Sequence, residues 1–180
     1  MARAPVPEAR LVDTDAGIRP EGEGWFVVNM ADAMSMGIDE SQYDFSFEGA
    51  PRAFPHFGIN VTVLGPGKPA AMYHAEAGQE AFLVLDGECT LIVEDQERRL
   101  RQWDFVHCPP HTAHVIVGAG NAPCAVLMVG ARNAGRDIVY LASRTAARYR
   151  ASVDEDTEDP KQVYAGWRQV ERRRYRWPPA

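Results

Sequence analysis

Cysteine is scarce in this chain of 180 residues, which contains only Cys89, Cys108 and Cys124. The number is odd, and no two cysteines stand in a Cys-x-x-Cys pair, so the sequence offers neither a disulfide framework nor the ligands of a zinc ribbon. We therefore expect reduced thiols that pack as small apolar side chains, as in a cytoplasmic protein.

Long apolar runs are also missing. No stretch of the sequence approaches the ~18 apolar residues that a transmembrane helix requires. The first residues, Met-Ala-Arg-Ala-Pro-Val-Pro-Glu, lack the apolar segment of a secretion signal. We expect a cytoplasmic protein with no membrane partner.

Positive charge is in deficit, with 19 Lys and Arg against 25 Asp and Glu and a net charge of −6. This balance argues against nucleic acid as a partner and favours a small-molecule substrate or ligand. The basic tail, residues 171–180, is interpreted as a solvated end of the chain. The sequence also lacks the complete glycine fingerprint of a dinucleotide-binding fold and the Gly-x-Ser-x-Gly element of a hydrolase.

Short apolar runs separated by turn residues dominate the middle of the chain. Their spacing of about 8–12 residues predicts an all-β sandwich or barrel. The expected strands are residues 25–29, 57–64, 70–74, 80–86, 88–94, 98–102, 104–108, 113–118, 123–132 and 137–141. Residues 31–48 are ambiguous, although the alternation of Tyr43, Phe45 and Phe47 is compatible with an edge strand. Gly87 and the Gly-Ala-Gly-Asn sequence at 118–121 are interpreted as hairpin turns.

The two ends of the chain have a different composition. Residues 1–24 are rich in Pro, Gly and acids, and predict an extended N-terminal arm. Residues 25–142 then form the barrel, and residues 143–180 form a C-terminal extension with a short helix. Asp159 followed by Pro160 is typical of an N-cap and first helical position, which predicts a helix through about residue 172.

Imidazole and carboxylate groups cluster in two stretches of the predicted barrel. His74 and Glu76 are two residues apart, so they share a face if that segment is extended. Glu80 opens the next strand, and His114 opens another. Such groups facing an apolar interior are costly unless they are paired or bound to an ion. Taken singly each is more often a surface or hydrogen-bonded residue, but together they predict a mononuclear metal site.

The spacing of these residues resembles the cupin family. The core of its first motif is His-x-His-x3–4-Glu-x6-Gly, where x is any residue. In this chain His74, Glu76, Glu80 and Gly87 take those places, with Glu76 in place of the second His. The resemblance covers roughly residues 56–131. It implies a double-stranded β-helix, also called a jelly-roll barrel.

The second cupin motif contains Pro, then Gly, then the ligand His. Here Pro109 takes the Pro place, His111 replaces the Gly and His114 takes the ligand place. Trp103 and Gly118 replace the Gly and Asn at the two ends of this motif. His is among the residues that tolerate a positive φ, so the turn at His111 is expected to survive and to place that imidazole near the pocket as a candidate proton shuttle.

The resemblance implies one divalent metal ion per chain, held by His74, Glu80 and His114 with Glu76 as a fourth ligand or a general base. Two imidazoles with one or two carboxylates favour Fe or Mn, while Zn and Ni remain open. The function implied is a metal-dependent dioxygenase or a sugar or keto-acid isomerase. The alternatives are a non-catalytic module that binds or senses a small ligand, and a structural protein with a relic site; the intact His74, Glu80 and His114 argue against the relic.

Two further predictions concern neighbouring residues and assembly. His107 and Cys108 alternate on one strand, so one of them faces inward, and His107 is a candidate for the pocket wall or for the core. His56, at a strand start, is expected to be a structural or a surface residue. Residues 80–86 are apolar on both faces, so the outer face needs a cover. The N-terminal arm, the C-terminal helix or a second subunit could provide it, and we expect a homodimer.

Overall fold

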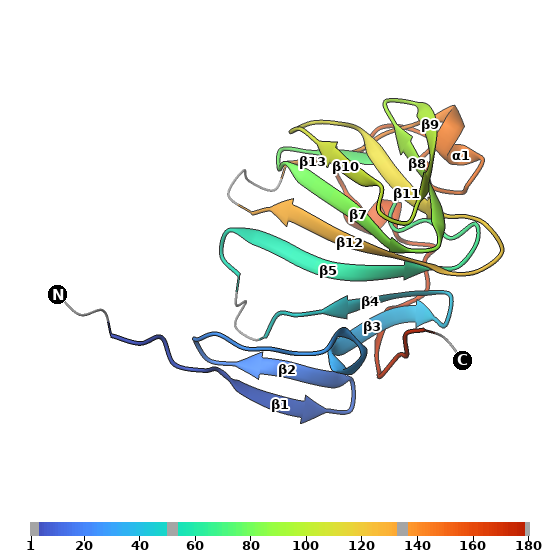
Figure 1. Cartoon of the computed structure of the whole chain (residues 1–180). Helices are drawn as coiled ribbons and strands as arrows, with labels where there is room; N and C mark the ends of the chain where they lie inside the picture. The colour runs from blue at the N-terminus through green and yellow to red at the C-terminus, as the bar shows by residue number, and fades with distance from the viewer. Residues whose placement is uncertain (1–3, 50–53, 133–136, 179–180) are drawn as a thin grey trace.

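Two antiparallel sheets that face each other form the body of the molecule in a computed structural model, which describes residues 4–49, 54–132 and 137–178 (Figure 1). The strand order of the larger sheet is β10-β7-β12-β5-β4-β3-β14, and that of the smaller sheet is β13-β6-β11-β8-β9. The all-β, double-stranded β-helix prediction is confirmed. Of the helices in these ranges, none has the length and hydropathy that crossing a bilayer requires.

The larger sheet contains the longest strands of the barrel. In sheet order its strands are β10 (Phe105–Cys108), β7 (Glu80–Asp86), β12 (Cys124–Ala131), β5 (Phe57–Leu64), β4 (Gln42–Ser46), β3 (Met34–Asp39) and β14 (Glu171–Arg172). β12 pairs with both β5 and β7, and is therefore central to this sheet. Residues 31–48, ambiguous in the sequence, thus contribute the β3–β4 hairpin.

The smaller sheet closes the other side of the barrel. In sheet order its strands are β13 (Ile138–Tyr140), β6 (His74–Glu76), β11 (His114–Gly118), β8 (Glu88–Val93) and β9 (Gln96–Arg101). Apolar side chains from both sheets, among them Leu64, Phe82, Leu91, Ile116 and Val126, pack between them as the central core.

The two predicted hairpins at Gly87 and at residues 118–121 are wrong. β7 and β8 lie in different sheets, and so do β11 and β12, so both connections carry the chain across the barrel. Gly87 has φ +73°, and a Cβ there would lie 2.9 Å from Cys124 Cα. A Cβ on Gly118 would lie 2.2 Å from the Gly65 carbonyl oxygen. These glycines serve close backbone contacts at sheet corners, which local turn chemistry does not distinguish from a hairpin.

Several short elements lie outside the two barrel sheets. β1 (Arg10–Thr14) and β2 (Gly17–Glu21) pair as a hairpin beside β3, at the end of the molecule opposite α1 (Arg144–Ala147) in Figure 1. η1 (Met30–Asp32) precedes β3. The predicted strand at 25–29 is wrong, because only a single bridge forms there. The strand predicted at 70–74 is misplaced, because β6 begins only at His74.

The C-terminal extension covers parts of both sheets. α2 (Pro160–Val163) begins at the predicted Asp159 N-cap, but it ends after one turn rather than near residue 172. Tyr175 then stacks on Tyr43 of β4 with 4.5 Å between ring centroids, so the tail covers the outer face of the larger sheet. This tertiary contact explains why the basic residues extend along β3 instead of continuing a helix. The division into arm, barrel and extension stays a prediction.

Candidate metal centre

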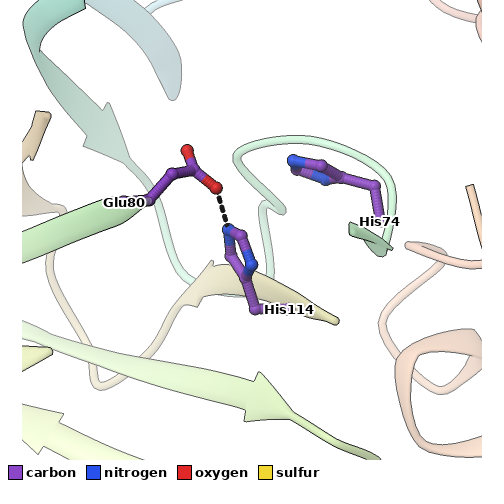
Figure 2. Close-up of side chains that lie close together, drawn as sticks. All are labelled: His74, Glu80 and His114. Carbon is purple, nitrogen blue, oxygen red and sulfur yellow. Dashed lines mark ion pairs between the residues drawn. The ribbon is translucent and has the colours of Figure 1, made fainter. Parts of the chain in front are cut away.

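The strands β6, β7 and β11 begin at His74, Glu80 and His114, and the fold brings these three starting residues together. One ligand atom from each of these side chains lies within 4.8 Å of the other two, although the residues come from three strands and two sheets. Figure 2 shows the Glu80 carboxylate and both imidazoles pointing into one space. Ligand atoms at about 2.1 Å from one ion are about 3–4 Å apart, so these three atoms are near the spacing that binding one ion requires.

Strand pairing sets the positions of the two imidazoles. His114 on β11 is the direct partner of His74 on β6, and their ring centroids are 4.9 Å apart. Phe82, which follows Glu80 on the same face of β7, packs against the His114 ring at 5.2 Å. The sites of both histidines are therefore fixed by backbone hydrogen bonds and by the apolar core beneath them.

The main chain also fixes which nitrogen of each imidazole is free. His74 Nδ1 donates to the Met72 carbonyl oxygen at 2.7 Å, and His114 Nδ1 donates to that of Thr112 at 2.9 Å. In the neutral ring this leaves the Nε2 lone pair as the ligand atom. Both imidazoles thus present Nε2 to the space beside Glu80.

Glu80 places a buried acceptor beside His114. Its Oε2 is buried without a well-formed hydrogen bond, and it lies 3.0 Å from His114 Nε2. Two lone pairs at that distance repel unless a proton or a metal cation lies with them. The donor set and the buried Glu80 oxygen, whose contact with His114 does not form a good hydrogen bond, therefore fit a divalent cation.

The ionisable groups of the cluster shift one another's pKa values. Burial would raise the pKa of Glu80, but the close polar contact with His114 and the charge of that imidazole outweigh it and hold the pKa below its usual value. Burial would lower the pKa of His114, but Glu80 raises it above the ordinary value. The pKa of His74 is lowered by burial and by the charge of His114. One imidazole therefore pairs with the carboxylate, while the other favours the neutral form that binds metals.

Glu76 lies beside Glu80 and outside the three-residue cluster. A Cβ built on Gly130 of β12 would be 3.6 Å from Glu80 Oε1 and 3.9 Å from Glu76 Oε1, which places both oxygens over that glycine. Burial, the charge of Glu80 and a hydrogen bond with it raise the pKa of Glu76 to about 7. This carboxyl group can therefore hold or release a proton near neutrality.

The remaining histidines lie at the surface. His107 is exposed, and Cys108 is the buried member of that pair, so the predictions of a pocket or core His107 are wrong. His56 is exposed, as expected. His111 has φ +64°, which confirms the predicted turn; its side chain is exposed, while its main-chain N–H donates to the Glu76 carbonyl oxygen. Its proton-shuttle role stays a prediction.

Aromatic residues near the cluster were missed in the sequence. Tyr140 on β13 pairs with His74, their rings are 6.1 Å apart, and burial together with the neighbouring Tyr164 raises the pKa of Tyr140 to about 12. Tyr164 comes from the C-terminal extension and packs edge-on against Tyr140 at 5.6 Å. The only local signal was the expected strand at 137–141, which gave no indication of its partner.

Comparison with known proteins gives one family match. The family model described as a cupin domain matches residues 60–130, which include Glu76, Glu80 and both histidines of the cluster. Among curated proteins, none matches this chain.

Solved structures similar to this chain share its barrel. The polyketide cyclase RemF from Streptomyces resistomycificus is 15% identical, with a TM-score of 0.53 over 63% of this chain and 83% of that one. A predicted oxalate decarboxylase from Thermotoga maritima is 16% identical, with a TM-score of 0.51 over 59% and 98%. These likenesses concern the fold alone.

A proposed sugar phosphate isomerase from Acidithiobacillus ferrooxidans is more similar in sequence. It is 34% identical over 47% of this chain and 54% of that one, with a TM-score of 0.43. The chain thus matches about half the length of that protein.

Proposed function

Because this chain is a member of the cupin superfamily, we propose that it is a metal-dependent enzyme that isomerises a small carbonyl compound, such as a sugar or keto acid, by proton transfer. The observation that carries the proposal is the pairing of two carboxyl groups with different tasks. Glu80 is held ionised beside two imidazoles, while Glu76, next to it, has a pKa of about 7.

His74, Glu80 and His114 are the residues that would hold the cation, which when bound supplies Lewis-acid polarisation of a substrate oxygen. Glu76 is the general base in this proposal. A carboxylate with a pKa near the working pH takes up a proton from carbon and returns it to the neighbouring carbon without becoming trapped in either form. The apolar wall around Phe82 excludes water from the exchange.

A second candidate reaction, dioxygenation, is favoured by the composition of the cluster. Two His and one carboxylate are the donor set of many non-haem iron oxygenases, and they leave coordination positions open. A redox-active native metal with oxygen uptake would favour it over isomerisation. A saturated zinc site without turnover would instead favour a non-catalytic ligand-binding module.

Elemental analysis of protein purified without chelator tests the metal centre. We expect about one divalent ion per chain in the wild type, with Fe or Mn preferred, and its loss in His114→Ala. His107→Ala is the matched control, because it removes an exposed imidazole elsewhere on the barrel. Equal metal content in all three proteins would contradict the site.

Solvent exchange separates the two reactions. In D2O, an isomerase incorporates deuterium at the carbon next to the substrate carbonyl, whereas a dioxygenase consumes oxygen instead. We expect incorporation into aldoses or keto acids by the metal-loaded protein, and a loss of at least ~100-fold in Glu76→Gln at unchanged metal content. Oxygen uptake without deuterium incorporation would replace the isomerase proposal with the oxygenase.

A further inference from the structure

A second cavity lies outside the three-residue metal cluster, between the β3–β4 side of the larger sheet and the C-terminal segment 164–170. Its volume is about 380 Å³, within the range of small-molecule sites. The polar groups that line it include Gln42, Asp44 and Thr62, and the C-terminal segment adds Tyr164, Trp167 and Arg168.

Asp44 presents an unused acceptor to this cavity. It alternates on β4 with Tyr43 and Phe45, which pack in the outer cluster, so Asp44 lies on the opposite, inner face. Thr62 Oγ1 donates to Asp44 Oδ1 at 2.5 Å and Asn60 Nδ2 donates to the same oxygen at 3.3 Å. Within the described part of the chain, no hydrogen bond or ion pair uses Oδ2.

The charge of Asp44 is also uncompensated by a direct cation contact in the described ranges. Burial raises the pKa of this carboxyl group, although the hydrogen bonds from Thr62 and Asn60 oppose the rise. A partly buried carboxylate with a free oxygen gains from a ligand that donates hydrogen bonds to it.

Gln42 provides a second acceptor on the same wall. Its Nε2 donates to the Pro69 carbonyl oxygen at 2.9 Å, which fixes the amide and leaves Oε1 as its acceptor. Two fixed acceptors, Asp44 Oδ2 and Gln42 Oε1, call for a ligand with at least two donors. Arg168 also lines the cavity, so a cationic ligand would meet a like charge.

The opposite wall is aromatic and is anchored at both ends. Tyr164 and Trp167 pack edge-on at 5.1 Å, and the Met72 N–H donates to the Tyr164 hydroxyl oxygen at 3.3 Å. In the chain, the segment that forms this wall is preceded by α2 with its Asp159 N-cap. It is followed by β14, which pairs with β3. The cavity is therefore formed in the resting fold, and its aromatic surface suits the C–H face of a small ring or chain.

We propose that this cavity binds a polyhydroxylated small molecule, whose hydroxyl groups donate to Asp44 and Gln42 and whose carbon skeleton packs on Tyr164 and Trp167. The proposal does not depend on the metal centre, and so goes beyond the proposed function. Tyr164, which lines the cavity, also contacts Tyr140, the strand partner of His74, so this pair of rings connects the two sites.

Ligand-observed NMR and titration calorimetry on the full chain test the proposal, with D-ribose, D-glucose and sorbitol as probes and choline as the contrasting cation. We expect at least one polyol to bind the wild type, and Asp44→Asn and Trp167→Ala each to weaken its binding tenfold or more. Asp32→Asn is the matched charge control, because Asp32 is exposed and does not line the cavity. Circular dichroism and thermal unfolding establish that each variant is folded.

His114→Ala distinguishes this site from the metal centre, since polyol binding should persist within twofold when the metal is lost. Loss of polyol binding in His114→Ala would place the ligand at the metal centre and overturn the cavity proposal, while leaving the proposed function intact. Binding of choline alone, binding of no probe, or wild-type affinity in a folded Asp44→Asn would also overturn it.

Discussion

At the scale of single residues, hydrogen bonds to the main chain give the cluster its chemistry. The carbonyl groups of Met72 and Thr112 hold Nδ1 of His74 and His114, so Nε2 of each ring is directed to the same space as Glu80. The sequence could indicate the residue types, but the contact between Glu80 and His114 depends on segments far apart in the chain.

The raised pKa of Glu76 predicts that the stability of the metal-free protein depends on pH. Its pKa of about 7 in the folded state exceeds the ordinary value of 4.5, so the folded state holds more protons between these values, and stability falls as pH rises through this window. Solvent screening at this partly exposed group limits the effect to about 1–2 kcal/mol.

Thermal unfolding with EDTA at pH 5 and pH 8 measures this effect. Glu76→Gln should flatten the difference in stability between the two pH values, and Glu23→Gln, at an exposed position, serves as a control for charge. An unchanged pH slope in Glu76→Gln would show that the proton resides elsewhere.

At the scale of elements, the glycines at the sheet corners decide how strands assemble. Alternation and turn residues were sufficient to locate most strands, including β5, β7 and β12, within a residue or two. They were insufficient to distinguish a hairpin from a crossing between sheets, because the same glycine serves both.

Gly118→Ala should destabilise the fold by about 1–3 kcal/mol, because the added Cβ would overlap the Gly65 carbonyl oxygen. Gly166→Ala is the control, since nothing lies within 4 Å of a Cβ at that position. Urea unfolding midpoints compare the two variants. Equal midpoints would mean that the corner relaxes without cost.

The one-turn α2 is the clearest failure of local reasoning at this scale. The Asp159 cap was identified correctly, but a cap starts a helix without fixing its length. Pairing of β14 with β3 and stacking of Tyr175 on Tyr43 hold the following residues extended instead.

At the scale of the whole molecule, the extended C-terminal tail, rather than the C-terminal helix named among the alternatives, covers part of the outer face of the larger sheet. It leaves Trp103 and Phe105, 67% and 66% exposed, beside the edge strand β10. Large exposed aromatic side chains next to an unpaired edge are typical of a surface that associates.

We therefore predict a homodimer of about 40 kDa, twice the 20.0 kDa chain, by light scattering at low micromolar concentration. Phe105→Asp should shift the mass toward the monomer, because it places a charge on the apolar edge. Val27→Asp is the matched control, since Val27 is also exposed but lies outside the barrel strands. A wild-type protein that is monomeric at this concentration would contradict the prediction.

The sequence by itself determined the β-rich barrel and the identity of the groups in the candidate metal site. The alternation of side chains along a strand indicates which residues share a face. The spacings from His74 to Gly87 and from Pro109 to His114 indicate which residues could form the candidate metal site. Both are local properties, so both can be read without coordinates.

Only the tertiary structure decided which groups meet. It paired His74 with His114 across two strands, placed Glu76 against Glu80 over Gly130, and brought Trp167 of the C-terminal extension to the same cavity as Asp44. The free energy of these contacts comes from burial and charge between segments that are distant in sequence, which no local pattern records.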